Sequence, residues 1–363
     1  MRCSISSNLA SAPVAEAPAA AGRPGSGVWQ AVLGIAISLA FLVWTVHDVN
    51  LAQVGAALRR VHWGLYVASA LIVTCTFPLR AVRWRIMLGG NGALPPLKPV
   101  WRAIAIGFMA NNVLPARAGE VVRAYAAQAL IGTRFTTALA TVAVERVFDG
   151  LVIIFLMTLA IAAPGFPSDA RIGGTDVTFS ALATWAGAGF AAVLVGLLVF
   201  VHAQERALAF ADRLARRVLP HRAADFVLRQ LHNVTAGLAV LRSPRDAARV
   251  LVWSFAVWFV NAASYVVAFR AFNIRGLAPT AALLLQGITA LGVAIPSSPG
   301  FWGVFEGTAR ASLSLYGVPP ESSVSFAVGV HLGWFIPITV IGLVVLARTG
   351  LSLRELRRGV RRA

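Results

Sequence analysis

Charged side chains are scarce in this chain, and the two signs are very unequal. Only 13% of the 363 residues are charged, with 14 Asp and Glu against 32 Lys and Arg, for a net charge of +18. Cysteine is nearly absent: Cys3 and Cys75 stand far apart, which excludes a disulfide framework and a cysteine-based zinc site. The six histidines show no metal-ligand spacing. We therefore predict no metal site and no cofactor.

Apolar residues take the place of the missing charge. They make up 58% of the sequence, and the mean hydropathy of +0.75 excludes an ordinary soluble domain. Apolar runs of about 20 residues recur, the length that crosses a membrane as a helix. The predicted fold class is an all-α polytopic membrane protein with about six full spans, at 28–47, 63–82, 133–163, 178–201, 248–270 and 325–347.

Two further apolar regions, 100–131 and 279–317, are interrupted. Asn111–Glu120 and Ala294–Glu306 each place Pro, Gly and one carboxylate inside a hydrophobic neighbourhood. Non-helical backbone at membrane depth is tolerated only where it is buried in protein or lines a watery cavity. We predict two broken or re-entrant helical hairpins, with two short crossings each as the alternative. Paired breaks of this kind point to a transport site.

The basic residues lie in blocks between apolar runs, a pattern that argues against nucleic acid as a partner and is typical of the positive-inside rule. The basic blocks at 80–102, 203–249 and the C-terminus are expected in the cytoplasm. The segments 164–177 and 317–324, which have few basic residues, are expected outside. Both termini are then cytoplasmic. Abundant Ala and a single lysine, Lys98, suggest a GC-rich bacterial genome, so the expected location is the bacterial inner (plasma) membrane.

This topology predicts an inverted repeat, because span, broken hairpin and span would occur twice in opposite orientations. We predict a disordered cytoplasmic tail over 1–27, a transmembrane domain over 28–350 and a basic cytoplasmic tail over 351–363. Within the transmembrane domain, the two repeat halves are 63–163 and 248–347, and a cytoplasmic amphipathic linker covers 203–249.

The first break carries residues suited to phosphate. A helix beginning near Pro115 would direct free N–H groups at the break. Arg117 offers a fork-shaped donor set for phosphate oxygens, and Arg123 a second. Glu120 can pair with Arg123, and Asn112 adds a polar group beside the break. The alternative is that the charged residues sit at the membrane interface, with their heads in water.

Glu145, Arg146 and Asp149 lie deep in a predicted span, roughly 18 Å from its start at 1.5 Å per residue. Charges at this depth cost at least about 2.5 kcal/mol each, so they must face protein or water. Arg146 and Asp149 can pair, which leaves Glu145 for Arg117 or Arg123, for a proton or for a cationic group of a ligand. The alternative is a structural ion-pair lock between helices.

In the second break, Glu306 is the candidate binding side chain, although it could simply pair with Arg310 four residues later. Trp302 would more often be an interfacial anchor. The backbone of the break can approach a ligand closely at Pro299, Gly300 and Gly303.

Three arginines, Arg80, Arg83 and Arg85, stand at the predicted cytoplasmic end of the second span. Contact with anionic headgroups is a weak prediction for them, and topology-setting charge is the default interpretation.

At these residues the chain resembles the lysylphosphatidylglycerol synthase transmembrane family of flippase-like integral membrane proteins. The resemblance covers about 28–350 and rests on Arg83-Trp84, Asn112–Glu120 with Arg123, Glu145–Asp149, and Pro299–Gly303 with Glu306. It implies lipid translocation. Because the sequence stops at Ala363, we expect a stand-alone member without the soluble aminoacyl-transferase domain.

The resulting hypothesis is a non-enzymatic lipid transporter or flippase with membrane lipids as its partners. It would pass an anionic or aminoacylated phospholipid, a hopanoid or a polyprenyl-linked lipid through a polar cavity at the two hairpins. One alternative is an integral-membrane lipid-modifying transferase. Another is a non-transporting membrane partner of a separate lipid-synthesising enzyme.

Overall fold

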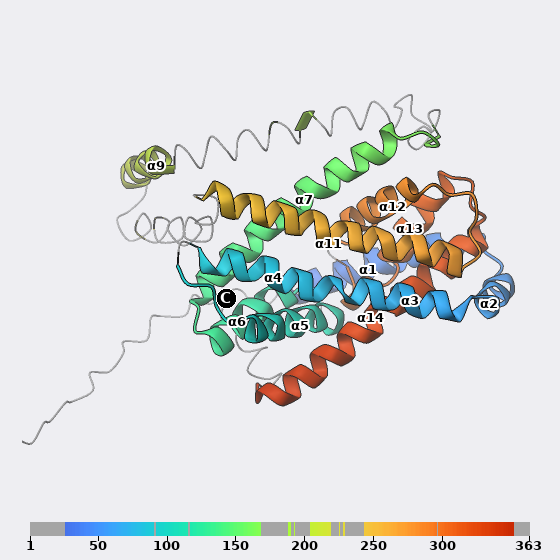
Figure 1. The fold of residues 1–363 in the computed structure, drawn as a ribbon, viewed down its shortest axis with the longest axis horizontal. Coiled ribbons are helices and arrows are strands. Elements are labelled where there is room, and N and C mark those ends of the chain that lie inside the picture. Colours follow the sequence, from blue (N-terminus) through green and yellow to red (C-terminus); the bar gives the residue numbers. More distant parts are fainter. Residues whose placement is uncertain are drawn as a thin grey trace, which may run out of the picture.

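The computed structural model describes residues 26–90, 92–114, 117–167, 188–189, 192, 204–218, 225, 228, 243–295 and 297–351. Every regular element in these ranges is helical, which confirms the all-α class. Before the linker these are α1 (Ser26–Val46), α2 (Leu51–Arg59), α3 (Trp63–Thr74), α4 (Thr76–Gly89), α5 (Leu97–Val113), α6 (Gly119–Ile131) and α7 (Phe135–Ala162) (Figure 1). After it come α9 (Gln204–Val218), α11 (Pro244–Ala271), α12 (Pro279–Gly292), the short η2 (Pro299–Phe301), α13 (Val304–Ser314) and α14 (Pro320–Thr349).

Within the described ranges, three helices are long and apolar enough to cross a membrane: α3 and α4 joined over Trp63–Gly89, α11, and α14, with 27, 28 and 30 residues. A fourth candidate is the pair of Val32–Val46 and α2, bent by 83°. The predicted count of six is therefore not confirmed among the described residues. The helix α7 has the length, but it carries three charged residues, and most of 178–201 lies outside the described ranges.

The order of elements and the way they pack both repeat. A long helix, two short helices and a second long helix occur as α3–α4, α5, α6, α7 and again as α11, α12, α13, α14. In each set the two short helices pack on each other, and the second of them packs on the following long helix. The first short helix of each set also packs on the last helix of the other set, α5 on α14 and α12 on α7. The two sets therefore interlock.

In each set the two short helices form a hairpin at one of the predicted breaks. With 13, 14 and 11 residues, α6, α12 and α13 fall short of the roughly 20 residues that cross a bilayer, whereas α5 has 17. The re-entrant form of the hairpins stays a prediction. In the first hairpin a Cβ added to Gly119 would come within 2.1 Å of the Gly107 carbonyl oxygen, so only glycine allows α5 and α6 to approach this closely.

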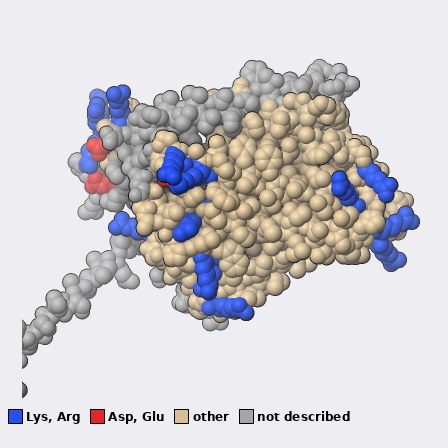
Figure 2. Space-filling view, viewed as in Figure 1, with Lys and Arg blue, Asp and Glu red and all other residues tan. Residues whose placement is uncertain are grey.

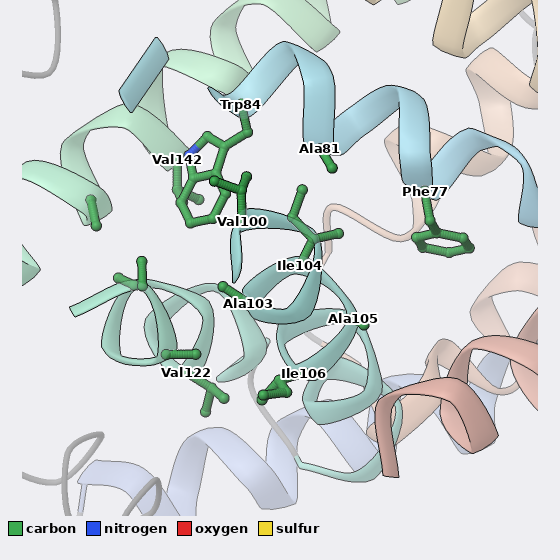
Figure 3. Packing of buried hydrophobic residues seen from close by; sticks show 14 of the residues in the cluster. Phe77, Ala81, Trp84, Val100, Ala103, Ile104, Ala105, Ile106, Val122 and Val142 are labelled. Carbon is green, nitrogen blue, oxygen red and sulfur yellow. The ribbon is translucent and has the colours of Figure 1, made fainter. Parts of the chain in front are cut away.

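One hydrophobic core joins α4, α5, α6 and α7 around Trp84. The fully buried Trp84 ring lies among Val100, Ile104 and Val142 (Figure 3), and its indole Nε1 donates to Thr141 Oγ1 at 3.0 Å. A second core joins α7, α11, α12, α13 and α14. On the face drawn in Figure 2, Lys and Arg gather toward the two ends of the long axis and leave a broad uncharged zone between them. Such a zone suits the hydrocarbon layer of a membrane.

The predicted tails and most of the predicted linker lie outside the described residues. Of the linker, the structure describes α9, two isolated positions and the start of α11.

Candidate functional site

A cavity of about 410 Å³ lies between the two broken hairpins. Its wall includes residues from both breaks, among them Arg117 after α5 and Phe301 in η2. Six of the predicted site residues and one predicted headgroup contact line it: Asn112, Arg117, Glu120, Arg123, Arg146, Asp149 and Arg80. The structure thus gathers the polar residues of the first break and of α7 around one space. The other predicted site residues do not line the cavity: Glu145, Pro299, Gly300, Gly303 and Glu306.

Arg83 organises the charges beside this cavity. Its side chain is fully buried, and its guanidinium lies 2.5 Å from Asp149 Oδ1 and 2.8 Å from Glu145 Oε1. It also donates to Ser254 Oγ on α11 at 2.9 Å. A buried cation bound by two carboxylates belongs to the interior, so the weak prediction of a headgroup contact for Arg83 is wrong. The reason is helical spacing, because Arg83 shares the inward face of α4 with Arg80.

Glu145 is fully buried on α7 and accepts from three arginines. Arg123 approaches its Oε2 at 2.6 Å, and Arg83 and Arg146 approach its Oε1 at 2.8 and 3.1 Å. The guanidinium of Arg123 also lies 3.8 Å from the ring centroid of Trp84, a cation–π contact. Of the two partners predicted for Glu145, Arg123 is therefore correct, whereas Arg117 is not in contact with it.

Arg146 connects this buried group to the cavity mouth. Its guanidinium lies 3.5 Å from Asp149 Oδ2, as predicted, and 3.7 Å from Glu120 Oε1. Glu120 pairs with Arg117 at 3.2 Å rather than with Arg123. Arg117 in turn donates to the Ala294 carbonyl at 3.4 Å, which links the first break to the second.

The start of α6 differs from the prediction. The helix begins at Gly119 instead of near Pro115, which is outside the described residues, and Arg117 stands before it with a φ of 54°. The N–H of Gly119 donates to Asn111 Oδ1 at 2.8 Å, so the first N–H of the helix already has an acceptor. Asn112 ties α5 to α14 by donating to Thr339 Oγ1 at 2.8 Å.

The remaining two arginines of α4 differ from each other. Arg80 lines the cavity, 3.8 Å from Asp149 and over the rings of Phe108 and Trp258. Arg85 donates to the Pro95 carbonyl at 2.6 Å and takes no part in the cavity wall.

In the second break, Glu306 has local partners instead of a ligand-facing position. Its Oε2 accepts from the Gly303 N–H at 2.7 Å, which caps α13, and its Oε1 lies 2.5 Å from His331 Nδ1. The buried His331 ring is stacked between Trp302 and Trp334, and its Nε2 lies 2.8 Å from the Gly300 carbonyl. Trp302 is half-buried and packs on the buried His331 ring, and its role as an interfacial anchor stays a prediction.

The predicted pair of Glu306 and Arg310 does not form. Arg310 binds Asp48 Oδ2 at 2.7 Å and the carbonyls of Trp44 and Thr45 at the end of α1. An i, i+4 spacing permits a pair on one helix, but here the acceptors of another helix compete successfully.

Sequence reasoning missed two features of the site. His331 is an ionisable residue inside a long apolar run, which is by itself a signal for a buried role. Asn261 on α11 and Gln286 on α12 also line the cavity, and their amides are joined at 3.2 Å. A single amide in an apolar segment carries a weaker signal. Among the described residues, no group of three or more His, Cys, Asp or Glu side chains is placed to hold a metal ion.

The fold and the site together define a polytopic membrane protein whose two broken hairpins enclose an arginine-lined cavity. The family described as "Lysylphosphatidylglycerol synthase TM region" matches residues 31–342, and the chain belongs to this family. The resemblance drawn from the motifs is therefore confirmed, and with it a function related to membrane lipids.

A curated relative is similar over a large part of the chain. The protein "Glycosyltransferase AglD" of Haloferax volcanii is 28% identical over 303 residues, which are 76% of this chain and 47% of the relative. The chain thus spans about half the length of this relative.

Proposed function

We propose that this protein moves a lipid with a phosphate-bearing headgroup between membrane leaflets, and that the headgroup passes through the arginine-lined cavity. The observation that carries this proposal is the charge of the cavity and its supporting groups. Five arginines (Arg80, Arg83, Arg117, Arg123 and Arg146) face three carboxylates (Glu120, Glu145 and Asp149). The cluster therefore holds two positive charges in excess.

An excess of buried cations favours an anionic ligand. Charges removed from water are costly unless they are paired, and arginine binds phosphate oxygens with two parallel donors. Three of the cavity-lining arginines keep an unused donor, because the Nε atoms of Arg117, Arg123 and Arg146 have no hydrogen-bond partner. A phosphate would supply both the missing charge and acceptors for guanidinium groups at the wall.

The backbone of the breaks supports passage through this site. Arg117 and Phe301 both line the cavity, and both have a positive φ, 54° and 65°. This conformation costs a residue other than glycine roughly 1–2 kcal/mol, and such strain clusters at functional sites. Arg117 also touches the second break at Ala294. A change in either hairpin would therefore move the main anion donor.

We further propose the inverted arrangement of the two sets in a bacterial inner membrane, with both termini in the cytoplasm. The repeated packing of the sets and the basic blocks of the sequence support it. Labelling of single cysteines in a background that carries both Cys3→Ser and Cys75→Ser tests it. Residues 203–249 and the C-terminus should be accessible from the cytoplasm and 164–177 from outside. Extracytoplasmic labelling of 203–249 would exclude the inverted repeat.

A leaflet-exchange assay in liposomes tests transport. Arg117→Gln should slow the movement of a fluorescent phospholipid by about 10-fold or more, because it removes a charge-assisted contact of about 1.5–3 kcal/mol. Arg117→Lys should restore only part of the rate, since an ammonium group cannot bind two oxygens in parallel. Arg249→Gln, which breaks an exposed pair with Asp246, is the control and should leave the rate unchanged. Equal rates in all four proteins would reject this site.

A lipid-modifying transferase, or a membrane partner of such an enzyme, is the second candidate, favoured by the name of the Haloferax relative. The same assay separates the two classes. A transporter moves lipid in liposomes that contain no donor substrate and leaves the lipid chemically unchanged. An enzyme needs a donor, and mass spectrometry then finds a product of different mass.

A further inference from the structure

A second part of the cavity wall, from α11 and α12, carries amides and hydroxyls and no charge. Gln286 is only 1% exposed and lines the cavity. Its Oε1 accepts from Asn261 Nδ2 at 3.2 Å, but its own Nε2 has no hydrogen-bond partner. The side chain of Asn261 also hydrogen-bonds the Tyr265 hydroxyl. The Gln286 NH₂ group is therefore the unused donor of this amide pair.

Two hydroxyl groups belong to the same wall. Tyr265 lies one turn after Asn261 on α11, and Thr289 lies about one turn after Gln286 on α12, so each pair shares a helix face. The Thr289 hydroxyl donates to the Leu285 carbonyl at 2.8 Å, and its oxygen can accept from the Tyr265 hydroxyl and from one further donor. The wall therefore offers at least one donor and one acceptor.

We propose that this amide wall, defined by Asn261, Tyr265, Gln286 and Thr289, is a subsite for the uncharged, hydroxyl-bearing part of the lipid headgroup, such as a polyol or a sugar. The proposal rests on the proposed function, because it assumes that the phosphate of the same lipid binds the arginines. Hydroxyl groups both donate and accept, as this wall does, whereas an ester carbonyl only accepts. None of the cavity-lining residues of α11 and α12 is charged, so an ammonium or a second phosphate finds no counter-charge here.

A purely structural role of the Asn261 and Gln286 amides explains the hydrogen bond between them but not the unused Gln286 NH₂ group. Amides often join helices in membranes, and the Asn261–Gln286 bond joins α11 to α12. That bond uses one group of each amide. It leaves the Gln286 Nε2 group without a partner in a buried side chain that lines the cavity, and an unused buried donor destabilises a fold unless a ligand or water completes it.

Binding of tail-matched lipids to the purified full-length protein tests the subsite. The probes are dioleoyl phosphatidylglycerol and phosphatidylinositol, which carry hydroxyls, and dioleoyl phosphatidylethanol, which has the same phosphodiester charge and no headgroup hydroxyl. We expect the first two to bind about 3- to 10-fold more tightly, the range of one or two net hydrogen bonds. Gln286→Met should abolish this difference and leave phosphatidylethanol binding unchanged.

Two control variants separate the possible failures. Ser69→Ala removes another buried hydrogen bond to α11, to the Ser264 carbonyl at 2.9 Å, outside this cavity, and should keep the preference. Arg117→Gln should weaken all three lipids equally. If Arg117→Gln has no effect while Gln286→Met still abolishes the preference, the phosphate site is wrong and the subsite stands.

Equal binding of all three lipids to the wild-type protein would overturn the subsite, as would a preference that survives Gln286→Met. Free glycerol 3-phosphate distinguishes the source of the headgroup. It should not compete with phosphatidylglycerol at equal concentration, and full competition would show that the ligand is a soluble phosphate.

Discussion

At the break between α5 and α6, Arg117 has a φ of 54°, and at the break between α12 and α13, Phe301 has a φ of 65°. Both residues line the same cavity. The first presents a guanidinium group and the second an aromatic ring. Two hairpins of similar build therefore face one space with opposite chemistry, as an amphipathic ligand with a charged and an apolar part would require.

The acidic residues near the first break and those in the second break also differ, in the partners that they bind. Behind the first break, Glu145 and Asp149 are shared among arginines from α4, α6 and α7, with positive charge in excess. In the second, Glu306 and His331 form a closed pair. His331 Nδ1 lies 2.5 Å from Glu306 Oε1 and His331 Nε2 lies 2.8 Å from the Gly300 carbonyl, so both ring nitrogens already have partners within the protein. The first region differs because its arginines outnumber its carboxylates.

Among variants that test the difference between the two breaks, we expect the largest loss of stability from a change of Arg83, beside the first break. Replacing it by Gln strands two buried carboxylates, Glu145 and Asp149, at a cost of about 3–5 kcal/mol. Detergent-extracted yield and melting temperature should fall steeply. Arg85→Gln, two residues later, removes one contact to a loop carbonyl and serves as the control, with little change. Equal melting temperatures for the two variants would contradict the central role of Arg83.

A double-mutant cycle tests whether the second region is a closed pair. Glu306→Gln and His331→Gln should each cost about 1.5–3 kcal/mol, the worth of a hydrogen bond to a charged group. The double variant should cost little more than one of them, because the partners act as a unit. The measurement is unfolding in detergent micelles. Strictly additive losses would show that the two side chains act independently.

The hairpins should also differ in their tolerance of an added methyl group. Gly119→Ala meets the Gly107 carbonyl and Asn111 and should cost about 1–3 kcal/mol. Gly292→Ala in the second hairpin meets only the Thr308 side chain, which can shift, so its cost should be smaller. Gly64→Ala on α3 has nothing within 4 Å and is the control. A melting temperature for Gly292→Ala below that of Gly119→Ala would reverse this ranking.

The smallest effect concerns Asp48, outside the spans. The hydrogen bond from Arg310 lowers the pKa of Asp48 below its ordinary value of 3.8. A lowered pKa stabilises the folded state above pH 3.8, and this contribution is lost as the pH falls through the folded value. The melting-temperature difference between wild type and Asp48→Asn should therefore be present at pH 6 and shrink below pH 4. A difference that grows with acidification would refute the pairing.

The sequence by itself determined the helical membrane class, the positions of the two breaks and the burial of Glu145 and Asp149. These follow from local properties: runs of apolar residues, Pro and Gly within them, and the cost of placing a charge in hydrocarbon. The family resemblance followed from the same motifs. The starts of helices were less certain, because α6 begins two residues after Arg117, where Gly119 fits against Gly107.

Only the tertiary structure decided which charges meet. Arg83 binds Asp149 across 66 positions of sequence, and Arg310 prefers Asp48, 262 positions away, to Glu306 on its own helix. Two other contacts arise in the same way, from the packing of helices that are separate in the sequence: Asn261 with Gln286, and His331 with Glu306. Each of these side chains has several candidate partners in the sequence. The packing of the two interlocked sets of helices selects one, because a buried charge or amide must be satisfied by whatever lies within about 3 Å of it.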